Sequence, residues 1–299
     1  MQVAPGLFLL PLPLEAPGFS SFIGAWLCRT DRLCFLVDPG PSATVPALAD
    51  MLDALEVDRL SFVLLTHIHL DHAGGAGDLL ARRGSCPVIC HSSAIAHLHN
   101  PARLWEGSLK TLGDLARSYG APRPVDKDLL ADAASFSEAG VKPILTPGHA
   151  PHHVSYLFRD VLFAGETGGV HADLAGGRSY LRPATPPRFF FETSLESLDA
   201  LIHTPHRLYC FGHFGSTERS AELLPAHREQ LHQWKDLIGE VMEQGRPDPL
   251  AASLSLLLER DPNLAGLSGF SPEVREREIY FLKNSIRGFM GYLSPRDAR

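Results

Sequence analysis

Four residues that could bind metal ions lie within six positions of one another, in the segment "VLLTHIHLDHAGG" at 63–75. They are His67, His69, Asp71 and His72. Neutral imidazoles and carboxylates suit zinc, manganese or iron, and the absence of thiolates argues against a closed structural zinc site. In an extended or looping backbone the first two histidines lie on one side and can bind one ion, while Asp71 and His72 face a second. The segment predicts an open, catalytic metal site.

Further residues of ligand type follow short aliphatic runs elsewhere in the chain. Asp38 follows "CFLV", His149 follows "ILTPG", Glu166 follows "VLFAG" and His213 follows "LYCFG". Strand ends at one edge of a sheet core can converge on a single crevice, which is where α/β proteins tend to bind ligands. Because core packing does not explain runs that end in this way, we expect these residues to meet His67 at one site.

Aliphatic runs and helical spacing alternate in the region that must position these residues. The runs that predict buried strands lie at 33–37, 60–66, 86–90, 143–146, 154–158, 161–165 and 207–212. Helical spacing of apolar residues appears at 45–55 and 195–202, and "AGDLLARR" at 76–83 reads as a helix after a tight turn. The sequence therefore predicts an α/β class with helices that cover sheets.

From about residue 217 the strand signals stop and helical patterns follow. A well-marked last helix begins with Ser271 as N-cap and Pro272 at its first position, and it carries an apolar stripe that leaves a homodimer contact open. We therefore divide the chain into an α/β domain at 1–216 and a helical extension at 217–299 packed on the core. The glycine- and proline-rich stretch at 168–192 predicts a long irregular segment.

The composition excludes several classes of function. With 299 residues, 44% hydrophobic content and a formal net charge of -7, the chain predicts a soluble globular protein without the basic surface of a nucleic-acid binder. Pro11 and Pro13 interrupt the apolar start, which has no basic segment, so we expect no signal peptide, no membrane helix and a cytoplasmic location. The five scattered cysteines are expected to be reduced and mostly buried.

With these motifs in place, the sequence resembles the metallo-β-lactamase-fold hydrolases. The resemblance covers roughly residues 5–216 and rests on five ordered motifs: "VDPG" at 37–40, "THIHLDHAGG" at 66–75, "TPGHAPHHVSYLF" at 146–158, "FAGE" at 163–166 and "FGHFG" at 211–215. Within the superfamily the chain looks most like a prokaryotic subgroup with "TPP" and "GHFG" segments. The resemblance implies a four-layer αββα sandwich, here followed by a C-terminal helical extension.

The same resemblance implies a centre with two metal ions, most commonly zinc, with iron or manganese as alternatives. One ion would be bound by His67, His69 and His149, the other by Asp71, His72 and His213, and Asp38 would brace the histidine loop. The bridging ligand of the family is normally an aspartate after a glycine, whereas here Glu166 follows Gly165. Because glutamate is one methylene longer, three arrangements stay open: a bridge with a shifted backbone, binding to one ion only, or a weaker second site.

The activity that the resemblance implies is hydrolysis of a small ester, thioester, lactone or phosphoester by a metal-bound hydroxide, with Asp71 and His72 as catalytic residues. Glu166 keeps a second hypothesis open, a mononuclear iron oxygenase of the persulfide-oxidising kind. A non-catalytic metal-binding protein is the third. Four further residues are candidates for bracing the ligands or contacting substrate: His91, His153, Arg178 and Arg182. We expect six other histidines at the surface or at an interface: His97, His99, His203, His206, His227 and His232.

Overall fold

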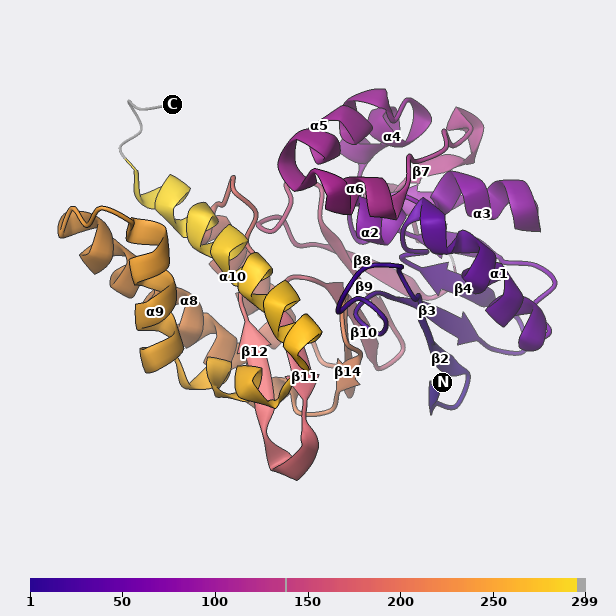
Figure 1. The fold of residues 1–299 in the computed structure, drawn as a ribbon. Coiled ribbons are helices and arrows are strands. Elements are labelled where there is room, and N and C mark those ends of the chain that lie inside the picture. Colours follow the sequence, from indigo (N-terminus) through magenta and orange to yellow (C-terminus); the bar gives the residue numbers. More distant parts are fainter. Residues whose placement is uncertain (138, 295–299) are drawn as a thin grey trace.

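Two sheets lie face to face at the centre of the computed structural model, which describes residues 1–137 and 139–294 (Figure 1). The first sheet has seven strands in sequence order: β1 (Gln2–Ala4), β2 (Leu7–Pro11), β3 (Gly24–Arg29), β4 (Cys34–Val37), β5 (Phe62–Leu64), β6 (Val88–Cys90) and β7 (Leu130–Asp132). The strands from β1 to β4 pair antiparallel, and those from β4 to β7 pair parallel. The parallel half carries the loops that hold the histidine motif.

The second sheet has five strands in the order β14 (Ser216–Thr217), β13 (Leu208–Phe211), β10 (Val161–Gly165), β9 (Val154–Phe158) and β8 (Val141–Leu145). Strands β10 and β13 run parallel, so their carboxyl ends lie at the same edge. The other neighbours pair antiparallel.

The prediction of an irregular segment at 168–192 is wrong for part of that stretch. Strands β11 (Val170–Asp173) and β12 (Ser179–Arg182) form an antiparallel hairpin with four paired positions. Both strands are short and carry His, Asp, Ser and Arg, and glycines lie between them, so hydrophobic periodicity does not reveal them.

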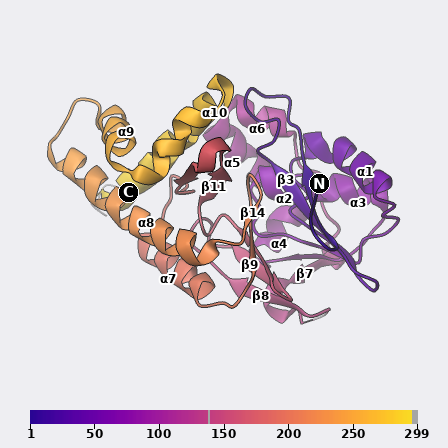
Figure 2. The same ribbon diagram turned by 90° about the horizontal axis from the view of Figure 1, so that it is seen from below.

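Helices cover the outer faces of both sheets. On the side of the first sheet lie α1 (Val45–Ala54), α2 (Leu70–Ala73), α3 (Ala76–Arg83), α4 (Ser92–His99), α5 (Ala102–Leu112) and α6 (Asp114–Tyr119). Beyond the second sheet lie α7 (Phe191–Ile202), α8 (Ser220–Glu243), α9 (Pro249–Arg260) and α10 (Pro272–Leu293) (Figure 2). Short 3-10 turns occupy Ser42–Thr44, Lys127–Leu129, Ala133–Ser135, Ala175–Gly177 and Pro262–Gly269. In the part of the chain that the structure describes, no helix is long and apolar enough to cross a membrane.

Three clusters of buried side chains separate these layers. The cluster between the sheets includes Trp26 and Phe35 from the first sheet and Tyr156 and Phe163 from the second. Trp26 also donates a hydrogen bond from Nε1 to the carbonyl of Phe211, at 3.0 Å, which links the two sheets directly. The other two clusters lie between each sheet and its helices. The predicted four-layer αββα sandwich with a C-terminal helical region is thus confirmed.

The cysteines lie where the sequence predicts, whereas one histidine does not. The five cysteines are free, and Cys34 alone among them is not fully buried, as expected. His227, by contrast, is not a surface residue: it is 2% exposed and shares a hydrogen bond of 3.0 Å with Gln230 on the inner face of α8. Two residues of the stretch at 168–192 contact this face: a Cβ at Gly169 would lie 2.8 Å from the His227 ring, and Gln230 donates to the Leu181 carbonyl at 2.8 Å.

A buried cluster of charged residues joins α10 to the β11–β12 hairpin. Arg182 donates from Nε to Glu278 at 2.5 Å, and Arg277 donates from Nη2 to the other carboxylate oxygen at 2.8 Å. All three side chains are at most 4% exposed. Burial alone raises the pKa of Glu278, but the two guanidinium groups outweigh burial and hold this pKa below its ordinary value.

We predict that Glu278→Gln destabilises the protein by about 3–5 kcal/mol, because it leaves two guanidinium groups buried without a counter-charge. Urea unfolding at neutral pH measures this loss. Asp160→Asn is the control, because the pair that Asp160 forms with Arg207 is exposed to solvent, so its loss should destabilise the protein far less. Equal losses in the two variants would contradict the structural role assigned to the buried cluster.

Candidate metal centre

Seven side chains of ligand type meet where strands of both sheets end. His67 lies three residues beyond the end of β5, Glu166 follows β10 directly, and His213 follows β13 after Gly212. Together they form two groups in which all the donor atoms lie within 4.8 Å of one another: His67, His69, His149 and Glu166 in one, and Asp71, His72 and His213 in the other. The structure therefore brings together every residue that the resemblance implied as a ligand, and we propose both groups as metal sites.

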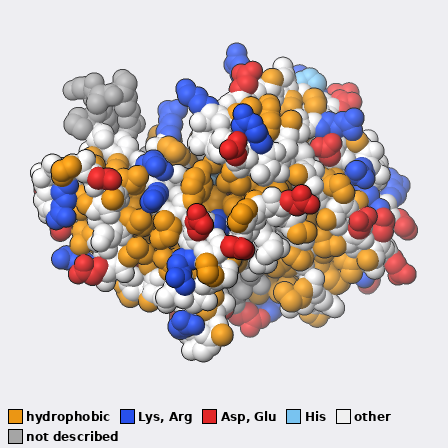
Figure 3. All heavy atoms as spheres, in the orientation of Figure 1, with side chains coloured by type: hydrophobic (Ala, Val, Ile, Leu, Met, Phe, Trp, Pro, Cys, Tyr) orange, Lys and Arg blue, Asp and Glu red, His pale blue; other side chains and the backbone are white. Residues whose placement is uncertain are grey.

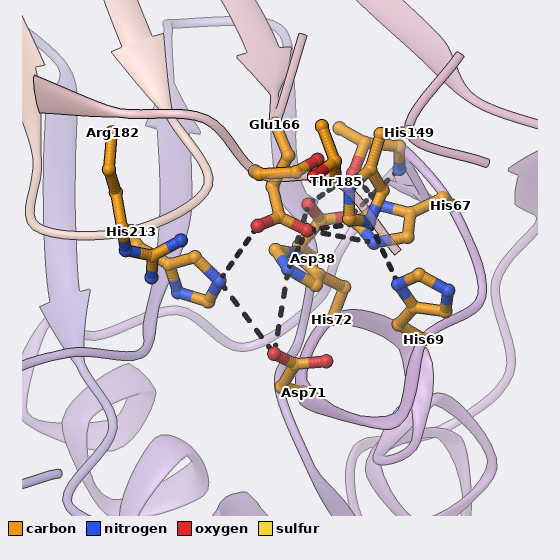
Figure 4. Close-up of polar contacts among 12 residues, drawn as sticks. Asp38, His67, His69, Asp71, His72, His149, Glu166, Arg182, Thr185 and His213 are labelled. Atoms are coloured by element: carbon orange, nitrogen blue, oxygen red, sulfur yellow. Dashed lines mark hydrogen bonds and ion pairs between the residues drawn. The ribbon is translucent and has the colours of Figure 1, made fainter. Parts of the chain in front are cut away.

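The carboxylate of Glu166 lies between the two groups (Figure 4). Its Oε2 is 2.8 Å from His149 Nε2 and 3.5 Å from His67 Nε2, and its Oε1 is 3.5 Å from His213 Nε2. Its Oε2 is also 3.7 Å from His72 Nε2. Oε2 thus faces the first group and also approaches His72, while Oε1 faces His213, so the carboxylate is near donor atoms of both groups, as a bridging carboxylate must be.

Three of the histidines are oriented by a hydrogen bond at the ring nitrogen that points away from the centre. The Nδ1 atoms of His67, His72 and His149 lie 3.0, 3.0 and 2.7 Å from Thr66 Oγ1, Asp38 Oδ2 and the Ala184 carbonyl oxygen. A partner at the outer nitrogen fixes both the tautomer and the direction of the ring. The inner Nε2 atoms are left to face the cluster.

Asp38 holds the histidine loop in place from beneath. Its carboxylate accepts from the Thr66 backbone N–H at 2.8 Å and from the Thr66 hydroxyl at 2.6 Å, in addition to its contact with His72. The residue has a φ of 52°, in the left-handed region that short polar side chains tolerate best. An aspartate at this position is therefore consistent with the backbone as well as with the hydrogen bonds.

His153 positions Glu166 from the opposite side. It is 0% exposed, its Nδ1 lies 2.8 Å from Thr146 Oγ1, and its Nε2 accepts the backbone N–H of Glu166 at 3.2 Å. A Cβ at position 165 would lie only 2.4 Å from that Nε2. Gly165 is needed because it lets the imidazole approach closely enough to fix the start of the Glu166 loop.

His213 is oriented by stacking instead of a hydrogen bond. Its Nδ1 is buried and has no hydrogen-bond partner among the described residues. Its ring lies on the ring of Phe22, with centroids 3.9 Å apart and planes 7° from parallel. The guanidinium carbon of Arg277 also lies over the Phe22 ring, 4.0 Å from its centroid. Sequence reasoning missed Phe22 and Arg277, because neither belongs to a motif with a ligand residue.

The electrostatics of the cluster favour a positive charge at its centre. Burial, followed by the neighbouring histidines, holds the pKa of His67 and His69 well below the ordinary range. Burial also lowers the pKa of His72, but Asp71, Asp38 and Glu166 outweigh it and raise this pKa to about 9. The first two imidazoles are therefore neutral, which is the form that binds metal, while the carboxylates attract a cation.

The donor atoms fit divalent metal ions. The Nε2 atoms of His67 and His72 are buried, and no hydrogen-bond partner for either is found in the described part of the chain. A buried polar atom without a partner is costly, so such atoms call for a ligand. Five imidazoles and two carboxylates without thiolates suit zinc, manganese or iron.

Three other candidates from the sequence lie outside both groups. His91 is the N-cap of α4, where its Nδ1 accepts from the Ser93 N–H at 3.2 Å. Arg178 is exposed at the tip of the β11–β12 hairpin. Arg182 lines the cavity above the two donor groups, but its guanidinium is paired with Glu278. Any role for these three in substrate binding remains a prediction.

The comparisons with known proteins agree with this geometry. A family model described as the metallo-beta-lactamase superfamily matches residues 21–213. A metallo-beta-lactamase fold-containing protein of Sulfurisphaera tokodaii is 28% identical over 236 residues, which are 76% of this chain and 84% of that protein. A hydroxyacylglutathione hydrolase of Acidiphilium cryptum is 32% identical over 211 residues, which are 70% and 69% of the respective chains.

A solved structure shares the fold over nearly the whole length. The metallo-beta-lactamase family protein of Thermus thermophilus is 22% identical and has a TM-score of 0.66, and the match covers 98% of this chain and 94% of that one. A match of this extent includes the C-terminal helices. The helical region is therefore part of a fold seen elsewhere.

We predict that Phe22→Leu weakens binding of Zn²⁺ or Co²⁺ by about tenfold, because leucine keeps the site apolar but removes the flat surface that orients His213. Titration of the metal-free protein against a competing chelator measures the affinity, and the visible spectrum of bound Co²⁺ reports changes in its ligands.

Phe35→Leu is the matched control, because Phe35 is fully buried between the sheets and stacks on Phe62 away from the centre. The two variants lose similar amounts of packing. Equal metal affinity in both would show that the ring of Phe22 does not position His213.

Proposed function

This chain belongs to the metallo-beta-lactamase superfamily, and from that membership we propose that it is a metal-dependent hydrolase of carboxylic esters and thioesters. The observation that carries the proposal is the set of seven donor side chains in two groups that share Glu166. A cavity of about 740 Å³ opens onto this set, with Asp71, His149 and Glu166 among its lining residues. Donors that face an open cavity indicate a catalytic site and not a structural one.

Two zinc ions are the proposed occupants. One would be held by His67, His69 and His149, the other by Asp71, His72 and His213, with Glu166 available to both. When bound, such ions polarise a carbonyl group and make water nucleophilic near neutral pH. Of the three arrangements that Glu166 leaves open, this proposal adopts the first, in which the glutamate bridges the two ions.

The chain's own residues would orient the reactants. The Asp71 carboxylate is 15% exposed toward the cavity and can accept a hydrogen bond from an attacking water molecule. The phenol of Tyr119 also lines the cavity. Burial, followed by the charges of Asp71 and Glu166, raises its pKa well above the ordinary value, so it stays neutral and able to donate a hydrogen bond to a substrate oxygen.

A cysteine nucleophile has no support. Burial raises the pKa of Cys28 and Cys86 to about 11 and that of Cys90 to about 12, so these thiols stay protonated and unreactive near neutral pH. None of the five cysteines lines the cavity above the donor groups. The attacking group that remains is water.

The similar proteins support a carbonyl substrate over a phosphoryl one. Several are hydroxyacylglutathione hydrolases, whose name describes the cleavage of a thioester, and they match this chain at 27–32% identity. At that distance the reaction class is a reasonable transfer, whereas the particular thioester is not.

We predict that the protein loaded with Zn²⁺ hydrolyses simple esters and thioesters, and that His69→Ala lowers kcat/KM at least about a hundredfold, because it removes one of the donors of the first group. Release of p-nitrophenol and of free thiol measures the two reactions, and elemental analysis measures the metal content of the same samples.

His203→Ala is the matched control, because His203 is an exposed histidine at the end of α7 whose ring contacts the Asp199 carbonyl. It should retain wild-type metal content and activity. Absence of hydrolysis by the wild type across ester and thioester panels would contradict the proposal, and a single iron with oxygen consumption would favour the oxygenase hypothesis.

A further inference from the structure

We propose that the substrate is an ester or thioester with an uncharged, apolar chain of medium length, bound between α5 and α10. This inference rests on the proposed hydrolase function and specifies its substrate class. We infer the substrate class from the residues of the cavity walls, since the proposed metal centre forms only the floor of the cavity. A volume of about 740 Å³ accommodates a substrate much larger than an acetyl group.

One wall of the cavity is helix α5. Leu104, Ser108 and Leu112 line it at intervals of four residues, so they lie on one face of the helix. No residue of α5 is fully buried, although the helix carries three leucines, which are usually buried in a folded protein. The face is completed by Gly107, where an added Cβ would meet no atom within 4 Å. The helix thus presents an incompletely covered apolar face, with small residues between its leucines, to the cavity.

The opposite wall is formed by α10, while α6 lies beside α5. Phe281 and Asn284 of α10 line the cavity, and Tyr119 at the end of α6 lies deeper. Figure 3 shows hydrophobic side chains gathered on the surface between α10 and the segment of α5 and α6. Apolar surface that stays open in a folded protein is a common mark of a ligand-binding groove.

The charges of the cavity disfavour an anionic substrate group. Among the described residues that line it, the cationic side chains are Arg103 and Arg182. Arg182 is bound to Glu278 at 2.5 Å and also donates to the Pro183 carbonyl, while Arg103 lies at the exposed rim. Asp71 and Glu166 are at the floor, where the metal ions of the proposed centre would occupy their charges, so they do not bear on the far end of the substrate. A tripeptide thiol such as glutathione, with two carboxylates, would find no buried counter-charge here, so this chain's substrate differs from that of the glutathione hydrolases it resembles.

The test compares p-nitrophenyl acetate, butyrate, hexanoate and octanoate on the zinc-loaded full-length protein, together with acetyl and octanoyl thioesters of N-acetylcysteamine and with S-lactoylglutathione. We expect kcat/KM to rise with chain length, by up to about fourfold for each methylene buried. The lactoylglutathione value should fall below that of the octanoyl thioester.

Variants on α5 test whether the alkyl chain of the substrate binds against this helix. Ser108→Phe fills the cavity face and should reduce the ratio of octanoate to acetate activity at least tenfold. Glu106→Phe adds the same ring to an exposed position of α5 outside the cavity lining and should leave the ratio unchanged. A binding measurement that needs no turnover completes the test: by calorimetry, 2-octanone should bind the metal-free wild type more tightly than 2-butanone, and Ser108→Phe should abolish the difference.

Two outcomes overturn the inference, and they differ from failure of the hydrolase proposal. If the protein hydrolyses p-nitrophenyl acetate and the acetyl thioester, but kcat/KM stays flat or falls with acyl chain length, the hydrolase proposal stands and the apolar substrate class is wrong. A preference for S-lactoylglutathione over the octanoyl thioester would lead to the same conclusion. Absence of hydrolysis for every ester and thioester would instead overturn the proposed function, and this inference with it.

Discussion

The buried carboxylate of Glu166 is the group on which the rest of the site depends. It lies within 3.7 Å of four imidazoles, those of His67, His72, His149 and His213. Burial alone would raise its pKa, but these imidazoles, His149 above all, outweigh burial and hold the pKa well below its ordinary value. A carboxylate in such a place is stable only when cations or hydrogen bonds compensate for lost solvent. The residues around Glu166 supply these charges and hydrogen bonds or hold the groups that do.

The two sheets and the C-terminal helices each position some of the side chains around Glu166. The parallel strands of the first sheet deliver the histidine loop, and Asp38 fixes that loop to the end of β4. The second sheet delivers Glu166 and His213 from the adjacent parallel strands β10 and β13. Helix α10 reaches the same site through Arg277 and the ring of Phe22, so the helical region contributes to the cluster of donor side chains as well as to one wall of the cavity.

The sequence predicted the parts of this arrangement that depend on local patterns. Strands β9 and β10 were placed at their observed bounds, and Ser271 caps α10 by accepting from the Val274 N–H. The ligand-type residues were found because each follows an aliphatic run. Helices α4 to α6 were missed, although Leu104, Trp105, Leu109 and Leu112 of α5 recur at helical spacing. These four side chains are only partly buried, which is why α5 can line a cavity. The stack of Arg277, Phe22 and His213 joins segments far apart in the chain, and no local pattern encodes such a contact. The division of the chain at residue 216 stays a prediction.

Anomalous diffraction from crystals of the protein grown with Zn²⁺ tests the central claim most directly. The account predicts two zinc peaks, one among His67, His69 and His149 and the other among Asp71, His72 and His213, with a carboxylate oxygen of Glu166 about 2.0–2.2 Å from each. A single peak, or two peaks that Glu166 does not join, would contradict it.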